Sequence, residues 1–406
     1  MNTNPRYKFC VIGGGTIAAS ILLITLEACK IENSDIDITC IYDASIPAIN
    51  TDKICSAKLL SLIQYQLNFL FQVDLSKFNG TIKFANKYVN FGDNDFYSSF
   101  YTPIFHMDGT KFNEFVFKKI KEIHNDNVTF VHDNVKNIKK GLDCAIVETE
   151  DGEVKYDYVF DCRGFPSDEQ LKSDDYDCSF ESPVNSVLLY SEEKYYNEWY
   201  TEYTATIDGW MYGIPLLNHK TFRYVYNNKI TSVENATRNF KKLKNIPENV
   251  ELRSLSWNPF FKKEVCDGNI ITVGDSLFFT ESSDDFRNHY TLSIVTFFLR
   301  TLFTKSKNIE FGYEETIQSK MNSYYTNEII MRNILRTLLF YQASVNIDSE
   351  FWKYARVLSS KGLEKIPKER IKRFYTDSER EWDSEYDIRY LNDFLNGLKI
   401  YINDYL

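Results

Sequence analysis

The sequence predicts an α/β fold in which a doubly wound, Rossmann-like domain carries an inserted, mainly antiparallel β-sheet lobe and is followed by a helical C-terminal region. Three observations predict it: a strand, a glycine turn and a helix at the start of the chain, a run of short strands in the middle, and helical periodicity from residue 286 onward. The chain of 406 residues is too long for one small core. We assign residues 1–177 and 261–310 to the nucleotide-binding domain, 178–260 to the sheet lobe and 311–406 to the helical region.

The first elements form a βαβ unit. Residues 7–12 read as a buried parallel strand, residues 16–29 have helical periodicity, and the next strand ends at Asp43. The elements that follow are a helix at 53–72, a strand at 80–91, a helix at 111–123, strands within 127–138, a hairpin of 143–149 and 154–160 closed by Glu150-Asp151-Gly152, and a buried strand that runs into Asp161-Cys162-Arg163-Gly164.

The middle of the chain changes to antiparallel strands, and the end of the chain to helices. The strands read SVLLY, WYTEYTATI, WMYGIPL and TFRYVYN, with a helix at 233–243 after them. Residues 268–279 return to the nucleotide-binding domain. The remaining elements are helices at 286–304, 312–345, 349–357 and 388–403, with a charged, solvated surface segment at 361–380.

Composition excludes several classes of function. The chain has 47 Lys and Arg against 57 Asp and Glu, a net charge of −10, which disfavours nucleic-acid or anionic-membrane partners. Its eight cysteines form no C-x-x-C pair and no metal-ligand spacing, so we expect no metal site and a reducing, cytoplasmic location. The uncharged run 9–26 contains three consecutive glycines and fits a strand, turn and helix better than a membrane span or signal peptide. We interpret each of the five histidines as a surface residue or a satisfied core residue.

The first chemical motif follows the first strand. Gly13, Gly15 and Ala18 form G-x-G-x-x-A, in which the first glycine permits the turn, the second admits a pyrophosphate and the alanine lets the helix pack on the sheet. The helix begins at Thr16, and its N-terminal N–H groups favour an anion. Asp43, at the end of the second strand, is placed to accept hydrogen bonds from a ribose. These residues predict dinucleotide binding.

Two later segments indicate which dinucleotide binds. Gly274-Asp275 follows the apolar strand IITV, and in flavoproteins with this layout a late Gly-Asp places its carboxylate on ribityl or ribose hydroxyls. Asp161 to Gly164 stand where such proteins have a D-x-x-G near the cofactor. We therefore expect FAD rather than NAD, and an FAD-binding domain of the flavin monooxygenase type.

The stretch DGWMYGIPL, residues 208–216, predicts a flat aromatic wall. Trp210 and Tyr212 are two apart and share one face of a strand, and Ile214-Pro215 ends it in extended backbone. An ordinary core strand is the alternative explanation of this stretch.

Together these motifs resemble the flavin-dependent halogenases of the tryptophan halogenase family. That family carries W-x-W-x-I-P, here Trp210 to Pro215 with Tyr212 for the second Trp, and a lysine strand F-K-x-G-I-x-F-x-N-W, here residues 82–93. The resemblance spans most of residues 6–300.

The resemblance implies an enzyme that makes hypohalous acid from reduced flavin, O₂ and a halide, and passes it along a tunnel beside the aromatic wall to a lysine. That lysine would be Lys83, which then chlorinates or brominates an electron-rich indole or phenol; Lys87 is the second candidate if the strand is regular. The chain has no second G-x-G-x-x-G for a nicotinamide, so a separate flavin reductase is the expected transient partner. A surface strand lysine is the alternative for Lys83.

The chain departs from the family in two places. The acid-Pro-Leu-Glu-Ser-Thr-Gly loop reads here as residues 281–287, ESSDDFR, with Asp284 at the position of the catalytic Glu and Arg287 at that of the Gly. Residues 46–53 lack the glycines of the family's flavin strap. Three interpretations therefore stand: a halogenase, a flavin monooxygenase that hydroxylates, and a non-halogenating FAD-binding descendant.

Overall fold

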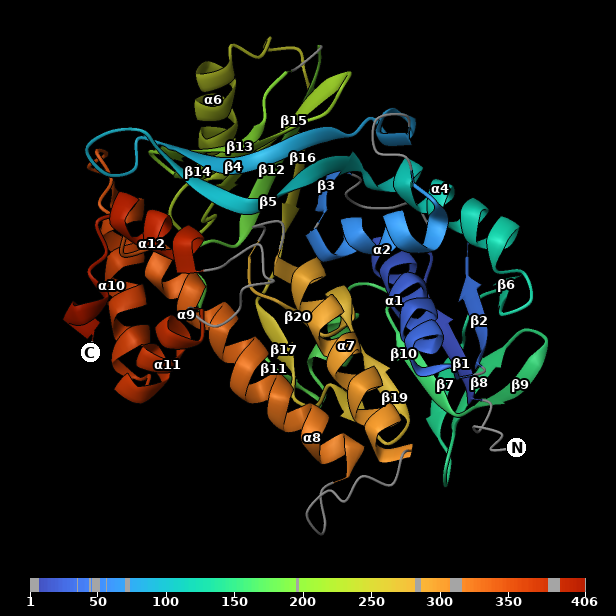
Figure 1. The fold of residues 1–406 in the computed structure, drawn as a ribbon. Helices are drawn as coiled ribbons and strands as arrows, with labels where there is room; N and C mark the ends of the chain where they lie inside the picture. The colour runs from blue at the N-terminus through green and yellow to red at the C-terminus, as the bar shows by residue number, and fades with distance from the viewer. Residues whose placement is uncertain are drawn as a thin grey trace.

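A computed structural model of the chain describes residues 7–34, 36–43, 45, 52–55, 57–69, 74–194, 197–281, 286–306, 316–378 and 388–405. Two large β-sheets organise these residues, and a group of C-terminal helices packs against the second sheet (Figure 1). The predicted α/β fold with a helical C-terminal region is confirmed.

The first sheet is the nucleotide-binding type of sheet that the N-terminal βαβ unit predicts. Its strand order is β18-β19-β10-β1-β2-β6, and all neighbours are parallel except β18 and β19. The strands are β1 (Tyr7–Ile12), β2 (Ile36–Tyr42), β6 (Val128–His132), β10 (Tyr158–Asp161), β18 (Cys266–Asp267) and β19 (Ile270–Thr272).

Alternate side chains of β1 enter two different cores. Phe9 and Val11 pack in the cluster formed with the helices, whereas Cys10 and Ile12 pack under a three-stranded antiparallel sheet. The helices are α1 (Thr16–Glu32), α2 (Ala57–Leu67), α4 (Gly109–Ile123) and α7 (Phe286–Ser306). The small sheet consists of β7 (Asn137–Lys140), β8 (Ala145–Thr149) and β9 (Gly152–Tyr156). Because both faces are covered, β1 is buried along most of its length.

The second sheet has eight strands in the order β16-β12-β15-β14-β13-β4-β5-β3. They are β3 (Asp52–Cys55), β4 (Thr81–Val89), β5 (Phe96–Asp108), β12 (Ser186–Glu193), β13 (Tyr200–Thr206), β14 (Gly209–Pro215), β15 (His219–Tyr226) and β16 (Arg253–Ser256). The parallel pair β4–β13 joins the two groups of strands. The sheet thus takes β3, β4 and β5 from outside the lobe predicted at 178–260.

The two faces of this sheet have different covers. Helix α6 (Val233–Lys244) packs on one face through Ala236 and Phe240, which contact Met211 and Tyr224. The C-terminal helices cover the opposite face, which we call the inner face (Figure 1). The elements on this face are α9 (Met331–Phe340), α10 (Glu350–Glu364), α11 (Lys368–Ser378), α12 (Ile388–Gly397) and a final 3₁₀ turn (Ile402–Tyr405). Helix α8 (Ile317–Tyr324) and the π-helical segment (Tyr325–Ile330) pack instead in the core of the first sheet.

The smaller elements connect these layers. They are the 3₁₀ turns η1 (Leu75–Phe78) and η2 (Gly274–Ser276), the short helix α5 (Asp168–Leu171), and a three-stranded sheet of β11 (Tyr176–Asp177), β17 (Phe260–Lys262) and β20 (Phe278–Phe279).

Four predicted elements need correction. The helix expected at 53–72 is strand β3 followed by α2, and the single helix expected at 312–345 is divided into α8, the π-helical segment and α9. The D-G hairpin is present, but its second strand is β9, whereas residues 158–161 join the parallel sheet as β10.

The charged segment 361–380 is also not simply a solvated surface segment. Most of its residues continue α10 or form α11, and Leu363 and Ile371 are buried beneath their charged neighbours. Leu363 lies at the end of α10 and Ile371 lies in α11, and the many charges around each of them obscure this burial in the sequence.

None of the described helices has both the length and the apolar character that a membrane crossing requires. Among the same residues, no group of three His, Cys, Asp or Glu is arranged to hold a metal ion.

Candidate active site

The predicted cofactor-binding residues come together at one edge of the parallel sheet. In the register, Ile12 of β1 lies opposite Ile41 of β2 and Asp161 of β10, and Asp161 lies opposite Thr272 of β19. The four strands therefore end side by side, and their carboxyl ends lead into the three motifs and Asp43. In open α/β sheets this edge is where ligands bind.

The turn after β1 leaves space in front of helix α1. Gly13 has φ +135°, and a Cβ there would lie 2.7 Å from the carbonyl oxygen of Cys162, so only glycine fits. Gly15 is the N-cap of α1 and has no side chain to cap the helix, and a Cβ built on it would meet no atom within 4 Å. Thr16 and Ala18 behind it are buried. Uncapped N–H groups facing open space suit a phosphate.

The late Gly-Asp turn packs directly against this helix. Gly274 has φ +71°, and its Cβ position lies 3.0 Å from Cγ1 of Ile17 in the first turn of α1. The adjacent Ser276 donates its hydroxyl to the carbonyl of Gly164 at 2.8 Å and accepts from the Gly164 N–H at 3.2 Å. Asp275 is therefore held beside the N-terminus of α1, as the prediction of a shared cofactor site requires.

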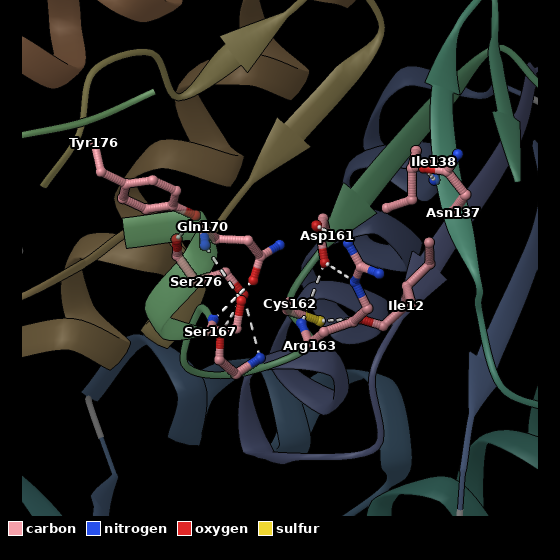
Figure 2. Close-up of polar contacts among 11 residues, drawn as sticks. Ile12, Asn137, Ile138, Asp161, Cys162, Arg163, Ser167, Gln170, Tyr176 and Ser276 are labelled. Carbon is pink, nitrogen blue, oxygen red and sulfur yellow. Dashed lines mark hydrogen bonds and ion pairs between the residues drawn. The ribbon is translucent and has the colours of Figure 1, made fainter. Parts of the chain in front are cut away.

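Asp161 and Asp43 have different environments at this edge. Asp161 accepts two hydrogen bonds of 2.9 Å from the guanidinium of Arg163, as Figure 2 shows. Asp43 accepts from the N–H of Ser45 at 2.8 Å, and hydrogen bonds from Ser45 lower the pKa of its carboxyl. Asp43 is thus an ionised acceptor, which suits the predicted contact with a ribose.

Lys83 lies on the inner face of the second sheet. Its side chain is fully buried on β4, with Nζ 5.1 Å from the ring centroid of Phe100. A register shift between Lys83 and Ala85 interrupts the pairing of β4 with β5. Such an irregularity changes which side chains face the core.

Lys87 does not share this environment. Buried positions alternate up to Ala85, but Asn86 and Tyr88 are the next buried residues, so the alternation moves by one position. Lys87 is 21% exposed, and its Nζ lies 3.4 Å from Oε2 of Glu202. The strand is not regular, and the expectation that Lys87 lies on the same face as Lys83 is wrong.

His106 is a buried neighbour of Lys83 that the sequence did not single out. It lies on β5 opposite Thr81, with Nδ1 3.1 Å from the Thr81 hydroxyl and Nε2 2.9 Å from that of Thr201. The one hydroxyl proton of Thr81 goes to the carbonyl of Pro215 at 2.6 Å, so Nδ1–H must donate to Thr81 and Nε2 must accept from Thr201. This histidine is a satisfied core residue, one of the two interpretations given above.

The charge state of His106 predicts how the stability of the protein changes with pH. Burial, together with Lys83 and Lys220, holds its pKa well below the ordinary 6.5, so the folded ring is neutral where the unfolded ring is protonated. The unfolded state then binds more protons, and stability falls as the pH drops below about 6.5, by up to about 1.4 kcal/mol per pH unit.

Urea denaturation at a series of pH values between about 5 and 7 measures this slope. His106→Gln, which retains a donor and an acceptor for the two threonines, is expected to remove this contribution. Equal slopes for the two proteins would refute the assignment.

The aromatic wall is part of a cross-strand row. The residues that lie opposite one another on successive strands are Phe96, Tyr88, Tyr203, Tyr212 and Arg223. Neighbouring rings in this row are within 17° of parallel, with centroids 4.8 to 5.6 Å apart. Trp210 stacks on Tyr212 at 5.4 Å, and Ile214 and Pro215 complete a fully buried strand. The register of the sheet, rather than β14 alone, makes the wall flat.

Arg223 explains why tyrosine suits position 212. Its Nη1 donates to the Tyr212 hydroxyl at 2.6 Å, and its guanidinium lies 5.2 Å from the ring centroid. Both side chains are buried, so the Tyr212 hydroxyl accepts a hydrogen bond from a charged guanidinium that water does not reach.

We expect Tyr212→Phe to lower the free energy of unfolding by about 1–3 kcal/mol, because a buried charged donor loses a hydrogen bond. Denaturant titration measures the change. A double-mutant cycle with Arg223→Met isolates the contact, since the second substitution should then cost less in the Tyr212→Phe background than in the wild type. Additive effects would refute a direct interaction.

Of the acidic loop at 281–287, residues 282–285 lie outside the described part of the chain, and the backbone of the last two residues begins α7. Glu281 is 5% exposed, and its Oε2 accepts a hydrogen bond of 2.8 Å from the hydroxyl of Tyr341. The same hydroxyl accepts one of 3.0 Å from Nε1 of Trp210. Asp284, the side chain of Arg287 and residues 46–51 lie outside the described part of the chain, so their predicted roles stay predictions.

Comparisons with known proteins identify the fold and the family. A flavin-dependent halogenase from Xanthomonas campestris matches with a TM-score of 0.75 and 15% identity, over 97% of this chain and 89% of that one. A tryptophan halogenase from Shewanella frigidimarina matches with a TM-score of 0.75 and 16% identity, over 98% and 90%. BrvH, a flavin-dependent halogenase from Brevundimonas sp. BAL3, gives 0.73 and 14%, over 97% and 90%.

At these identities the solved structures establish the fold alone, and no curated protein matches the sequence. The family model described as tryptophan halogenase matches residues 99–388, a range that includes Trp210, Glu281 and Gly274 but begins after Lys83. This match covers most of the chain. The chain therefore belongs to the tryptophan halogenase family of flavin-dependent halogenases.

Proposed function

We propose that the protein is an FAD-dependent halogenase that uses O₂ and a halide to halogenate a small, electron-rich aromatic substrate of the indole or phenol type, with Lys83 as the catalytic residue. The observation that carries the proposal is the fully buried lysine on the inner face of the sheet that also forms the aromatic row. Lysine side chains are rarely fully buried, and the burial of Lys83 beside this row supports a role in the site.

The residues at the edge of the parallel sheet fit FAD. The N–H groups of the first turn of α1, in front of Gly13 and Gly15, would hold the pyrophosphate. Asp43 would accept from ribose hydroxyls, and Asp275 from the ribityl or ribose hydroxyls on the other side of the turn. When bound and reduced, the flavin would activate O₂, which is the oxidant that converts halide to hypohalous acid. A separate reductase would deliver it.

Lys83 would receive the electrophilic halogen and present it to the aromatic carbon. Its amine lies against the ring of Phe100, where the low polarity disfavours water. His106 is a satisfied neighbour, and its neutral ring adds no positive charge to the site. Trp210 and Tyr212 would separate the flavin from the substrate, so that the substrate meets the halogenating species only at the lysine.

The proposal is tested with purified protein, FAD, a flavin reductase and a panel of indoles and phenols, in parallel with chloride, bromide and iodide. Product masses are read by mass spectrometry. A halide-dependent mass shift supports the proposal. A gain of one oxygen would make the protein a hydroxylase, and no product despite tight FAD binding would make it a non-halogenating descendant.

A further inference from the structure

A single buried hydroxyl connects three separate parts of the protein. Tyr341 directly follows α9 in the C-terminal region, Trp210 belongs to the aromatic wall, and Glu281 begins the acidic loop after β20. The Tyr341 oxygen lies 3.0 Å from Nε1 of Trp210 and 2.8 Å from Oε2 of Glu281. Exposures of 0%, 1% and 5% for Tyr341, Trp210 and Glu281 exclude most water from the contacts.

The chemistry of the three groups fixes the direction of both hydrogen bonds. An indole N–H can only donate, so the Tyr341 oxygen accepts from Trp210. The hydroxyl has one proton, and this proton is donated to the Glu281 oxygen. Burial and the charge of Glu281 raise the pKa of Tyr341 well above its ordinary value, so the hydroxyl keeps this proton. The two hydrogen bonds therefore run in one direction: Trp210 donates to Tyr341, and Tyr341 donates to Glu281.

Packing fixes the rings of Trp210 and Tyr341, the first two members of this chain. The indole of Trp210 lies against Tyr212, with centroids 5.4 Å apart, and against Phe340 at 5.5 Å. Tyr341 packs on Trp352, and the indole of Trp352 donates to the carbonyl of Thr206 at 2.9 Å. Packing sets the position of the Trp210 ring, and the bond to Tyr341 sets its tilt and the direction of its N–H.

We propose that Tyr341 is a positioning residue for halogenation: it fixes the indole of the wall and the carboxylate of the loop relative to each other. The inference rests on the proposed function, because the wall guides hypohalous acid only if its ring keeps its orientation. Without the hydroxyl, the indole N–H and the carboxylate each lose a buried partner and reorient. Hypohalous acid then escapes before it reaches Lys83, and less product forms per flavin oxidised.

The kinetic test compares Tyr341→Phe with Tyr325→Phe. Tyr325 is an equally buried tyrosine of the same helical region, but its hydroxyl bonds only weakly, at 3.5 Å, to the backbone carbonyl of Leu277. We expect Tyr341→Phe to lower the ratio of halogenated product to reduced flavin oxidised at least about fivefold, with the substrate KM unchanged. Tyr325→Phe should retain the wild-type ratio. A wild-type ratio in Tyr341→Phe overturns the proposal.

A spectroscopic test does not depend on activity. The chain has five tryptophans, so 5-fluorotryptophan labelling gives five ¹⁹F signals, and Trp210→Phe assigns one of them. We expect Tyr341→Phe and Glu281→Ala to move the Trp210 signal, and Glu281→Gln, which keeps an acceptor for Tyr341, to move it less. A Trp210 signal that stays in place in Tyr341→Phe overturns the proposal. A signal that moves while the ratio of halogenated product to flavin oxidised stays at the wild-type value overturns it as well.

The two tests separate the positioning role from the proposed function. If the wild-type protein makes no halogenated product with any halide, the proposed function fails. The fluorine signals then still show whether Tyr341 holds Trp210 in place.

Discussion

Lys83→Met is expected to lower halogenation turnover at least about 100-fold, the usual effect of losing a group that acts directly on the reacting atoms. Methionine fills a similar volume without the amine, so the buried site on β4 stays packed. The proposed flavin-binding edge belongs to the other sheet, and FAD affinity should therefore remain at the wild-type value. Product formation under saturating substrate and FAD titration by fluorescence quenching measure the two quantities.

Lys87→Met is the matched control for this prediction. It removes a lysine from the same strand, but one that is partly exposed and paired with Glu202. Exposed ion pairs contribute about 0–1 kcal/mol, so stability and turnover should change little. Activity that survives in Lys83→Met, or disappears equally in Lys87→Met, would contradict the role of Lys83.

The second large effect concerns Gly15. We expect Gly15→Leu to weaken FAD binding at least about 100-fold, because the new side chain fills the space in front of the helix N-terminus where the pyrophosphate would lie. The backbone of Gly15 has φ −90° and ψ −175°, which any residue adopts, and its Cβ would meet no atom within 4 Å. The midpoint of thermal unfolding without flavin should therefore stay close to that of the wild type.

Gly13→Ala provides the contrast. Its backbone has φ +135°, and the added Cβ would lie 2.7 Å from the carbonyl of Cys162, so we expect lost stability as well as lost flavin binding. Thermal unfolding and FAD titration of both variants separate the two effects. Tight FAD binding by Gly15→Leu would place the cofactor elsewhere.

The cofactor edge was predictable because its signals are local. Each predicted residue there follows a strand that the sequence identifies, and parallel strands bring their carboxyl ends to one edge without further information. Gly13, Asp43 and Gly274 therefore lie where the pattern places them. The shared face of Trp210 and Tyr212 was predictable for a similar reason, since they are two apart on one strand, whereas the rest of the aromatic row comes from the register of other strands.

The rest depended on contacts that sequence spacing does not contain. The register shift after Lys83, which separates it from Lys87, arises from the pairing of β4 with β5. Tyr341 joins the site through side-chain packing of the C-terminal helices. Nothing in the sequence distinguishes His106 from the other histidines. Its environment is set by the pairing of β5 with β4, which places it opposite Thr81. Strand pairing and side-chain packing between distant parts of the chain determine these three features. A single sequence shows which residue types are present but not which of them come into contact.

The parallel pairing of β4 with β13 also affects how the protein folds during synthesis. Strands β3, β4 and β5 emerge from the ribosome early, but the partner of β4 begins at Tyr200, after residues 90–199 have been made. At about 5–20 residues per second, the edge of β4 waits about 5–20 seconds for that partner. During this interval the strand that carries Lys83 is an open edge, the part of a nascent chain most prone to pairing with another molecule.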